Sequence, residues 1–274
     1  MTTHLTRISA DGHLHVYPQF RLDQAFDSLM ANLDCNARDF WLSDPQDTVR
    51  LAFLTEGSDC RFFEQLRDGT VNSAAAGLEI VAPREALSLT LIHRGSRKLC
   101  LIAGRQIVTR ERLEVLGLAM RESIPDGLSV RETISRIVAS GGIPVLPWAP
   151  GKWLFGRGRL VRELVAAGQS GTLVLGDSSL RPSGWPEPAS MRLARARGLM
   201  ILPGSDPLPL PGEERQMGAY GFVYEGPFDP EHPADSVRAL LAGDPTRSIP
   251  AGRRNNLLQV ISRLHRLRKM KKDV

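Results

Sequence analysis

The chain has few of the features that mark a cross-linked, secreted or membrane-spanning protein. Its 274 residues include only three cysteines and six histidines, and 6% of them are aromatic. Three scattered cysteines with no C-x-x-C pair exclude a disulfide framework and a cysteine-based zinc site. No apolar run reaches the roughly 18 residues that a transmembrane helix needs, and the N-terminus has no apolar signal segment. We therefore expect a soluble, cytoplasmic protein.

The positive charge is concentrated at one end of the chain. The formal net charge is +5, yet residues 251–274 alone hold eight lysines and arginines against one acid, Asp273. The remaining body consequently carries slightly more acids than bases. Such a body offers no basic surface for DNA or RNA, so we do not expect a nucleic-acid partner.

Strand-like and helix-like segments alternate along the chain. Residues 5–9 and 48–54 have the apolar pattern of strands, with a helix over 21–33 between them. Residues 86–92 and 98–103 flank a polar turn and predict an added β-hairpin. Further strands are predicted at 104–109, 113–118, 143–146, 172–175 and 199–202, and helices at 129–140, 159–167 and 189–197. This alternation predicts an α/β fold with a parallel sheet.

Two histidines follow the first predicted strand. In an extended chain Asp11, His13 and His15 share one face, because side chains alternate between faces. Two imidazoles on one face can bind one metal ion, and Asp11 can either join them as a ligand or orient a ring. The alternative interpretation is a pair of surface histidines with no ligand.

Motifs placed in order along the chain resemble those of the PHP (polymerase and histidinol phosphatase) superfamily. Residues 11–15 are similar to its opening H-x-H motif, and residues 204–208 to its closing S-D-x-H motif. Segments 51–57, 102–107, 113–118 and 141–148 are similar to the strands between them. The resemblance implies a distorted TIM-like (β/α)7-type barrel, here with the added β-hairpin and a C-terminal helix, and a metal site at the C-terminal ends of the strands.

Several metal ligands of that family are replaced in this chain. Glu56 stands where an aspartate is usual, Gln106 replaces a glutamate, and Glu114 and Leu208 replace histidines. His13, His15 and Asp206 remain at matching positions, with Glu56 as a further oxygen donor. The resemblance thus implies a degenerate site for one divalent metal (zinc, manganese or iron) rather than a multinuclear cluster.

Cationic side chains occur in two of the predicted strand-to-helix loops. Lys152 and Arg157 lie in the glycine-rich segment 148–159, and Arg181 lies in the next such loop. We predict that they attract an anionic substrate, the alternative being ordinary surface cations.

Residues 255–270 form an apolar stripe at helical spacing that is surrounded by cations. We therefore divide the chain into a hydrolase barrel over residues 1–250 and a basic amphipathic helix over residues 251–274. This helix can pack on the barrel, or it can contact a membrane surface or a partner protein.

Three functions follow from these features. The first is a metal-dependent hydrolase that acts on a phosphoester or another anionic small molecule. The second is a catalytically inactive PHP-like barrel that serves as a binding or scaffolding module through its basic tail. The third is an amidohydrolase-like enzyme, because that family also opens with H-x-H and closes with an aspartate. That family needs a histidine on a middle strand, and His93 is instead predicted to be an exposed turn residue.

Overall fold

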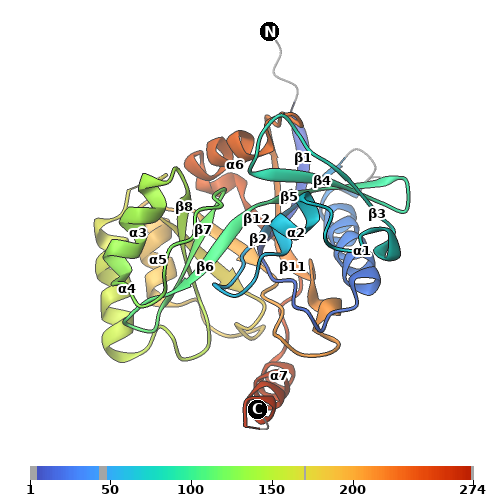
Figure 1. The fold of residues 1–274 in the computed structure, drawn as a ribbon. Coiled ribbons are helices and arrows are strands. Elements are labelled where there is room, and N and C mark those ends of the chain that lie inside the picture. Colours follow the sequence, from blue (N-terminus) through green and yellow to red (C-terminus); the bar gives the residue numbers. More distant parts are fainter. Residues whose placement is uncertain (1–4, 43–47, 170, 273–274) are drawn as a thin grey trace.

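The computed structural model describes residues 5–42, 48–169 and 171–272. They form a mixed α/β fold with two sheets and seven α-helices (Figure 1). The seven-stranded sheet has the order β12-β11-β1-β2-β5-β4-β3, and the five-stranded sheet has the order β10-β9-β8-β7-β6. The strands are β1 Thr6–Leu14, β2 Thr48–Leu54, β3 Leu78–Val81, β4 Ser88–His93, β5 Arg97–Ile102, β6 Gly104–Val108, β7 Glu114–Leu118, β8 Ile143–Pro147, β9 Val174–Ser178, β10 Ile201–Gly204, β11 Tyr220–Gly226 and β12 Ile249–Gly252.

The helices cover the outer faces of the two sheets. In Figure 1, α3, α4 and α5 lie beside the five-stranded sheet, and α1 lies beside the seven-stranded sheet. Each outer layer has its own apolar core, and a third core lies between the sheets and reaches α6. The helices are α1 Leu22–Trp41, α2 Phe62–Arg67, α3 Val130–Ala139, α4 Phe155–Ala167, α5 Ala189–Ala196, α6 Pro233–Ala242 and α7 Leu257–Met270. None of the described helices is both long and apolar enough to span a bilayer.

The expected parallel sheet is only partly present. β1, β2 and β5 pair in parallel, as do β8, β9 and β10, whereas β11, β6 and β7 pair with their neighbours in the antiparallel sense. The described strands do not close into one continuous barrel. The two sheets are linked instead by a single bridge between Glu56 and Arg105 and by the approach of β1 to β10.

Glycines make the approach of β1 to β10 possible. A Cβ atom at Gly204 would sit against the backbone nitrogen of His13 and lie 2.9 Å from its Cα atom. On the opposing strand, a Cβ atom at Gly12 would lie 2.6 Å from the carbonyl oxygen of Pro203. Since real Cβ atoms do not come this close to backbone, the ends of the two strands can meet only without side chains here.

Most of the predicted elements up to residue 204 are present, with shifted ends. β2 has the predicted bounds, and β1 continues five residues beyond Ser9, so that His13 lies within it. β11, α6 and β12 were not predicted. His93 was predicted to be exposed, and this is wrong: the side chain is fully buried at the end of β4, next to Asp27 and Arg97.

The C-terminal helix α7 packs on the body of the molecule. It starts at a capping box between Asn256 and Gln259. Its buried Arg263 binds the Glu213 carboxylate, with Nη2 2.5 Å from Oε2, and apolar residues beside Arg263 contact the cluster of Leu180, Leu208 and Leu210. The predicted domain boundary after residue 250 falls inside β12.

Substituting Gly204→Ala should test the contact between β1 and β10. We expect the free energy of unfolding to fall by about 1–3 kcal/mol, because the new methyl group overlaps the backbone of His13. Gly156→Ala is the matched control, since no atom lies within 4 Å of a Cβ there and the position is helical; it should be neutral or slightly stabilising. Equal stability of both variants in urea denaturation would contradict this account.

Candidate metal centre

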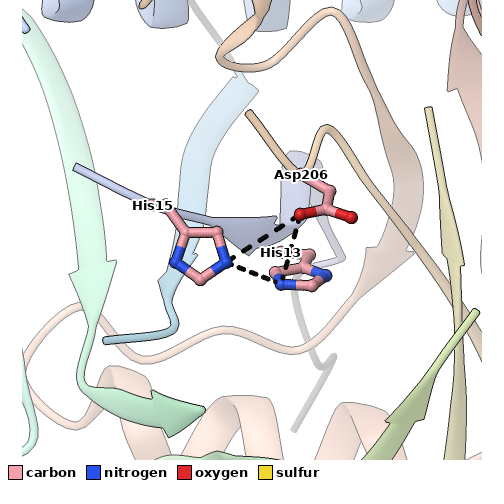
Figure 2. Close-up of side chains that lie close together, drawn as sticks. All are labelled: His13, His15 and Asp206. Carbon is pink, nitrogen blue, oxygen red and sulfur yellow. Dashed lines mark hydrogen bonds and ion pairs between the residues drawn. The ribbon is translucent and has the colours of Figure 1, made fainter. Parts of the chain in front are cut away.

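Three side chains from distant parts of the chain converge at the junction of the sheets. His13 lies near the end of β1, His15 follows the strand, and Asp206 follows β10. Their side chains point toward one another (Figure 2). His13 Nε2 lies 3.0 Å from His15 Nε2 and 3.7 Å from Asp206 Oδ1, and His15 Nε2 lies 3.9 Å from the same oxygen. Among the described residues, these three alone form a group of at least three potential metal ligands.

The spacing of these three atoms fits one divalent ion. The circle through the three donor atoms has a radius of about 2.1 Å. An ion at its centre would therefore lie about 2.1 Å from each of the two imidazole nitrogens and from the carboxylate oxygen. Metal–imidazole and metal–carboxylate bonds to zinc are about 2.0–2.2 Å long. Two imidazoles and one carboxylate therefore fit a single ion and leave positions open for water or substrate.

Burial holds both imidazoles in the neutral form that binds metals. It lowers the pKa of His13 to about 4 and that of His15 to about 3, the latter also through the neighbouring His13. His15 additionally stacks on Tyr17, with ring centroids 5.3 Å apart. At neutral pH no proton has to leave these rings before an ion binds.

The carboxylate of Asp206 is fixed by its own backbone and by a hydroxyl group. The residue has a left-handed backbone with φ of 50°, and its N–H donates to the carbonyl oxygen of His13 over 2.9 Å. The Ser178 hydroxyl donates to Oδ2 over 3.0 Å, which leaves Oδ1 facing the histidines. Such an unusual backbone in a non-glycine residue persists where surrounding contacts enforce it, commonly at functional sites.

Asp11 has a different role from the two considered for it in the sequence. It neither joins the ligands nor orients a ring, because its fully buried carboxylate accepts bonds from backbone groups. The N–H groups of His13, Ser205 and Gly218 donate to it over 3.1, 2.8 and 2.9 Å, and the Ser205 hydroxyl also donates to it. The register of β1 against β2 shifts just after Asp11, which breaks the simple alternation of faces.

Further polar groups surround the three potential ligands. Gln106 Oε1 on β6 lies 3.3 Å from His13 Nε2, at the position where the family has a metal-binding glutamate. The negative charge of Glu114 on β7 acts on both His13 and Tyr17. Burial and the nearby carboxylates raise the pKa of Tyr17, so its hydroxyl stays protonated at neutral pH. Tyr17 and Gln106 were not among the predicted site residues.

Glu56 does not lie with the other predicted ligands. Its carboxylate accepts the N–H of Phe63 over 3.0 Å and lies 3.4 Å from Arg105 Nη1. It also accepts a weak bond from the Cys60 thiol. These contacts fix the start of α2 against β6, and the structure does not bring Glu56 into the group formed by His13, His15 and Asp206.

The three predicted substrate-binding cations have different surroundings. Lys152 is linked to the site through Glu114, because its Nζ lies 3.0 Å from Oε1 of Glu114 and the charge of Glu114 acts on His13. Arg157 donates to the carbonyl oxygen of Gly151 in the same loop. Arg181 is largely buried and binds both oxygens of Asp177, which also accepts the Tyr220 hydroxyl, so its guanidinium already has a partner.

Comparison with known proteins gives matches at the level of structure. No protein-family model matches the chain, and no curated protein matches it in sequence. PsfC from Pseudomonas syringae is similar in structure, with a TM-score of 0.55 and 14% identity over 91% of this chain and 92% of that chain. A likeness at this identity establishes a shared fold.

Two further structures are similar over part of their length. One is a two-domain protein from Bacteroides vulgatus that contains a predicted PHP-like metal-dependent phosphoesterase, with a TM-score of 0.49, 12% identity and 91% of this chain matched to 66% of that one. The other is a lesion-specific endonuclease from Pyrococcus furiosus, with a TM-score of 0.48, 12% identity and 87% of this chain matched to 56% of that one.

Replacement of Asp11 should destabilise the fold. Four hydrogen-bond donors converge on the Asp11 carboxylate, and in Asp11→Asn one of its two accepting oxygens becomes an NH2 group that cannot accept. We therefore expect the free energy of unfolding at pH 8 to fall by about 1–3 kcal/mol. The exposed Asp235 on α6 provides the control Asp235→Asn, which should stay within about 0.5 kcal/mol of the wild type. Comparable urea midpoints for the two variants would contradict this role.

The lowered pKa values of the two histidines predict acid sensitivity in the metal-free protein. Above about pH 6.5 both imidazoles are neutral in the folded and in the unfolded chain. As the pH falls toward 4, the unfolded chain binds protons that the buried imidazoles do not, so the free energy of unfolding decreases. Each histidine should contribute a slope of up to about 1.4 kcal/mol per pH unit.

The comparison of wild type with His15→Gln isolates one of these contributions. Burial raises the pKa of Asp11 to about 6, so this residue makes the fold more stable as the pH falls, which is the opposite effect. Asp11 is present in both proteins, so its effect cancels in the comparison. Denaturant titrations between pH 6.5 and 4 should give a shallower decline for the variant. Parallel declines would show that His15 is protonated equally in the folded and unfolded states.

Proposed function

We propose that this chain is a PHP-like, metal-dependent hydrolase with one divalent ion bound by His13, His15 and Asp206. One observation carries the proposal: the three donor atoms lie on a circle whose radius of about 2.1 Å equals a metal–ligand bond. Zinc, manganese and iron all suit this donor set. Glu56 is left out of the ligand set because Phe63 and Arg105 already bind its carboxylate.

The fold assigned to this enzyme is a distorted (β/α)7-type barrel formed by β1, β2 and β6–β10. The bridge between Glu56 and Arg105 would join β2 to β6, and the contact of β1 with β10 would complete the ring. In such barrels the active site lies at the C-terminal ends of the strands. His13, His15 and Asp206 all lie at the ends of their strands, which supports this assignment.

A bound ion would supply a Lewis acid and a water molecule of lowered pKa. The protein's own groups would orient the reaction around it. Gln106 offers a neutral amide oxygen next to His13, and Tyr17 offers a protonated hydroxyl beside His15. Ser178 holds Asp206 in one orientation. Replacing the family's glutamate with Gln106 removes one negative charge, which favours one ion over a cluster.

The proposed substrate is a phosphoester or another anionic small molecule. Lys152 supports this proposal most directly, because its ammonium group reaches Glu114, whose charge acts on His13. Arg157 lies in the first turn of α4, directly after this loop, and would add to the positive potential. Arg181 would act indirectly by holding the loop after β9, since Asp177 occupies its guanidinium.

Metal titration of chelator-treated protein tests the proposed ligand set. We expect about one Zn²⁺ or Mn²⁺ per chain by calorimetry, and a loss of at least tenfold in affinity for His13→Ala and Asp206→Asn. His265→Ala removes an exposed histidine of α7 and should bind metal as the wild type does. A folded wild-type protein that binds no metal would favour the inactive binding module instead.

Hydrolysis of a simple phosphomonoester such as p-nitrophenyl phosphate tests the proposed role of Lys152. Lys152→Ala should raise KM severalfold and change kcat less, since a flexible cation outside the ligand set contributes mainly to substrate binding. Lys98→Ala, an exposed lysine on β5, serves as the control for net charge. Metal-dependent turnover with unchanged KM in Lys152→Ala would remove Lys152 from the substrate site and leave the metal proposal intact.

A further inference from the structure

Apolar side chains from three separate elements gather on one face beside α7. They surround a groove of about 760 Å³ that lies between the start of α4, the loop before α5 and the first half of α7. Three of the four tryptophans, Trp148, Trp153 and Trp185, line this groove. We call the exposed part of this lining the apolar face; it consists of Leu154, Phe155, Trp185, Leu257 and Ile261.

The apolar face is unusually exposed for side chains of this size. Phe155 is 93% exposed, and Leu154, Trp185 and Ile261 are each about half exposed. Leu258, three residues before Ile261 on α7, is 77% exposed and extends the face. Exposed apolar patches of this kind mark surfaces that contact a partner or a membrane.

The backbone at Phe155 adds a second unusual feature. The residue has a left-handed conformation with φ of 54°, which is unfavourable for a bulky side chain, and it presents the ring to solvent at the start of α4. Residues in such conformations cluster at functional sites. Neither the metal centre nor the apolar cores use this ring.

Cations surround the apolar face, and the nearby acid is neutralised. Arg162 and Arg192 line the groove, and in the described part of the chain Arg162 has no acidic partner. The carboxylate of Glu187, the acid in the lining, is paired with Arg195 over 2.9 Å. The rim of the groove therefore carries net positive charge.

Helix α7 continues the same combination of apolar and cationic groups. Its buried side contains Val260 and Arg263. At 100° per residue, the opposite side presents Leu258 and Ile261 in the first half and the exposed cations Arg268 and Lys269 in the second half. Neither of these two cations has an acidic partner among the described residues.

We propose that the apolar face and the outward side of α7 dock on an anionic lipid bilayer. Phe155, Leu258, Ile261 and Trp185 would insert among the acyl chains near the headgroups, and the surrounding cations would contact lipid phosphates. Protein surfaces that contact a membrane interface typically combine tryptophan at the rim, protruding leucine and phenylalanine, and flanking arginine and lysine. An acidic protein groove would match the charge, but it does not account as well for Phe155, which is 93% exposed, or for the half-exposed Trp185.

The docking surface is independent of the proposed catalysis but lies close to the metal centre. Arg263 of α7 donates to the carbonyl oxygen of Asp206 over 3.4 Å. Leu180, in the groove lining, donates its N–H to the hydroxyl oxygen of Ser178, which in turn binds Asp206. Docking would therefore hold the candidate metal centre near the bilayer surface. The proposal makes no use of a bound metal.

Vesicle co-sedimentation of the full-length protein tests this proposal. Vesicles of phosphatidylcholine with about one third phosphatidylglycerol should bind the wild type, and binding should weaken with added salt and with pure phosphatidylcholine. The double variant Phe155→Ser with Ile261→Ser should lower the partition coefficient about tenfold or more, because two inserted apolar side chains are lost.

Leu42→Ser provides a matched control. Leu42 is also left-handed, with φ of 52°, and 87% exposed, but it ends α1 on the seven-stranded sheet. This variant should sediment as the wild type does, and circular dichroism should show that all variants are folded. Wild-type protein that stays in the supernatant with anionic vesicles would overturn the proposal, as would equal partition of the double variant and Leu42→Ser. A dimer that is lost in the double variant, without vesicle binding, would assign the face to a second copy of the chain instead.

Discussion

The candidate metal centre depends on one buried carboxylate, that of Asp11. This group lies on β1 and accepts hydrogen bonds from the turn after β10, 194 residues away, and from Gly218, 207 residues away. Its burial raises its own pKa to about 6, a cost that four donors offset in part. By fixing Ser205 against β1, Asp11 determines where the next residue, Asp206, is placed.

The positions of His13 and Asp206 follow from this arrangement. Gly204 removes the side chain that would separate β10 from β1, and the N–H of Asp206 then binds the carbonyl oxygen of His13. The three potential ligands are therefore held before any ion arrives, because backbone contacts rather than the ion bring them together. Preorganised ligands lose little conformational freedom on binding, which favours affinity.

The sequence predicted the potential ligands better than it predicted the architecture. The H-x-H motif and the S-D-x-H-like segment after β10 pointed to His13, His15 and Asp206, and the structure brings these three side chains together. The role of Asp11 could not be predicted, since its partners are backbone groups that leave no pattern in the sequence. Glu56 matched a family position, yet Arg105 and Phe63 bind its carboxylate in the folded chain.

Long-range pairing explains the other differences. β11 pairs with β1 and β12 pairs with β11, and neither strand has strong alternation in its own sequence. His93 appeared to be a turn residue because Gly95 follows it, but it ends β4, and its buried ring lies next to Asp27 of α1 and Arg97 of β5. In each case contacts with residues distant in sequence override the local pattern.

X-ray absorption spectroscopy of the zinc-loaded protein tests the central claim most directly. The account predicts one zinc environment with nitrogen and oxygen neighbours at about 2.0–2.2 Å and the outer-shell scattering of two imidazoles, reduced to one imidazole in His13→Ala. A spectrum without histidine scattering, or one that is unchanged in His13→Ala, would contradict a metal centre formed by His13, His15 and Asp206.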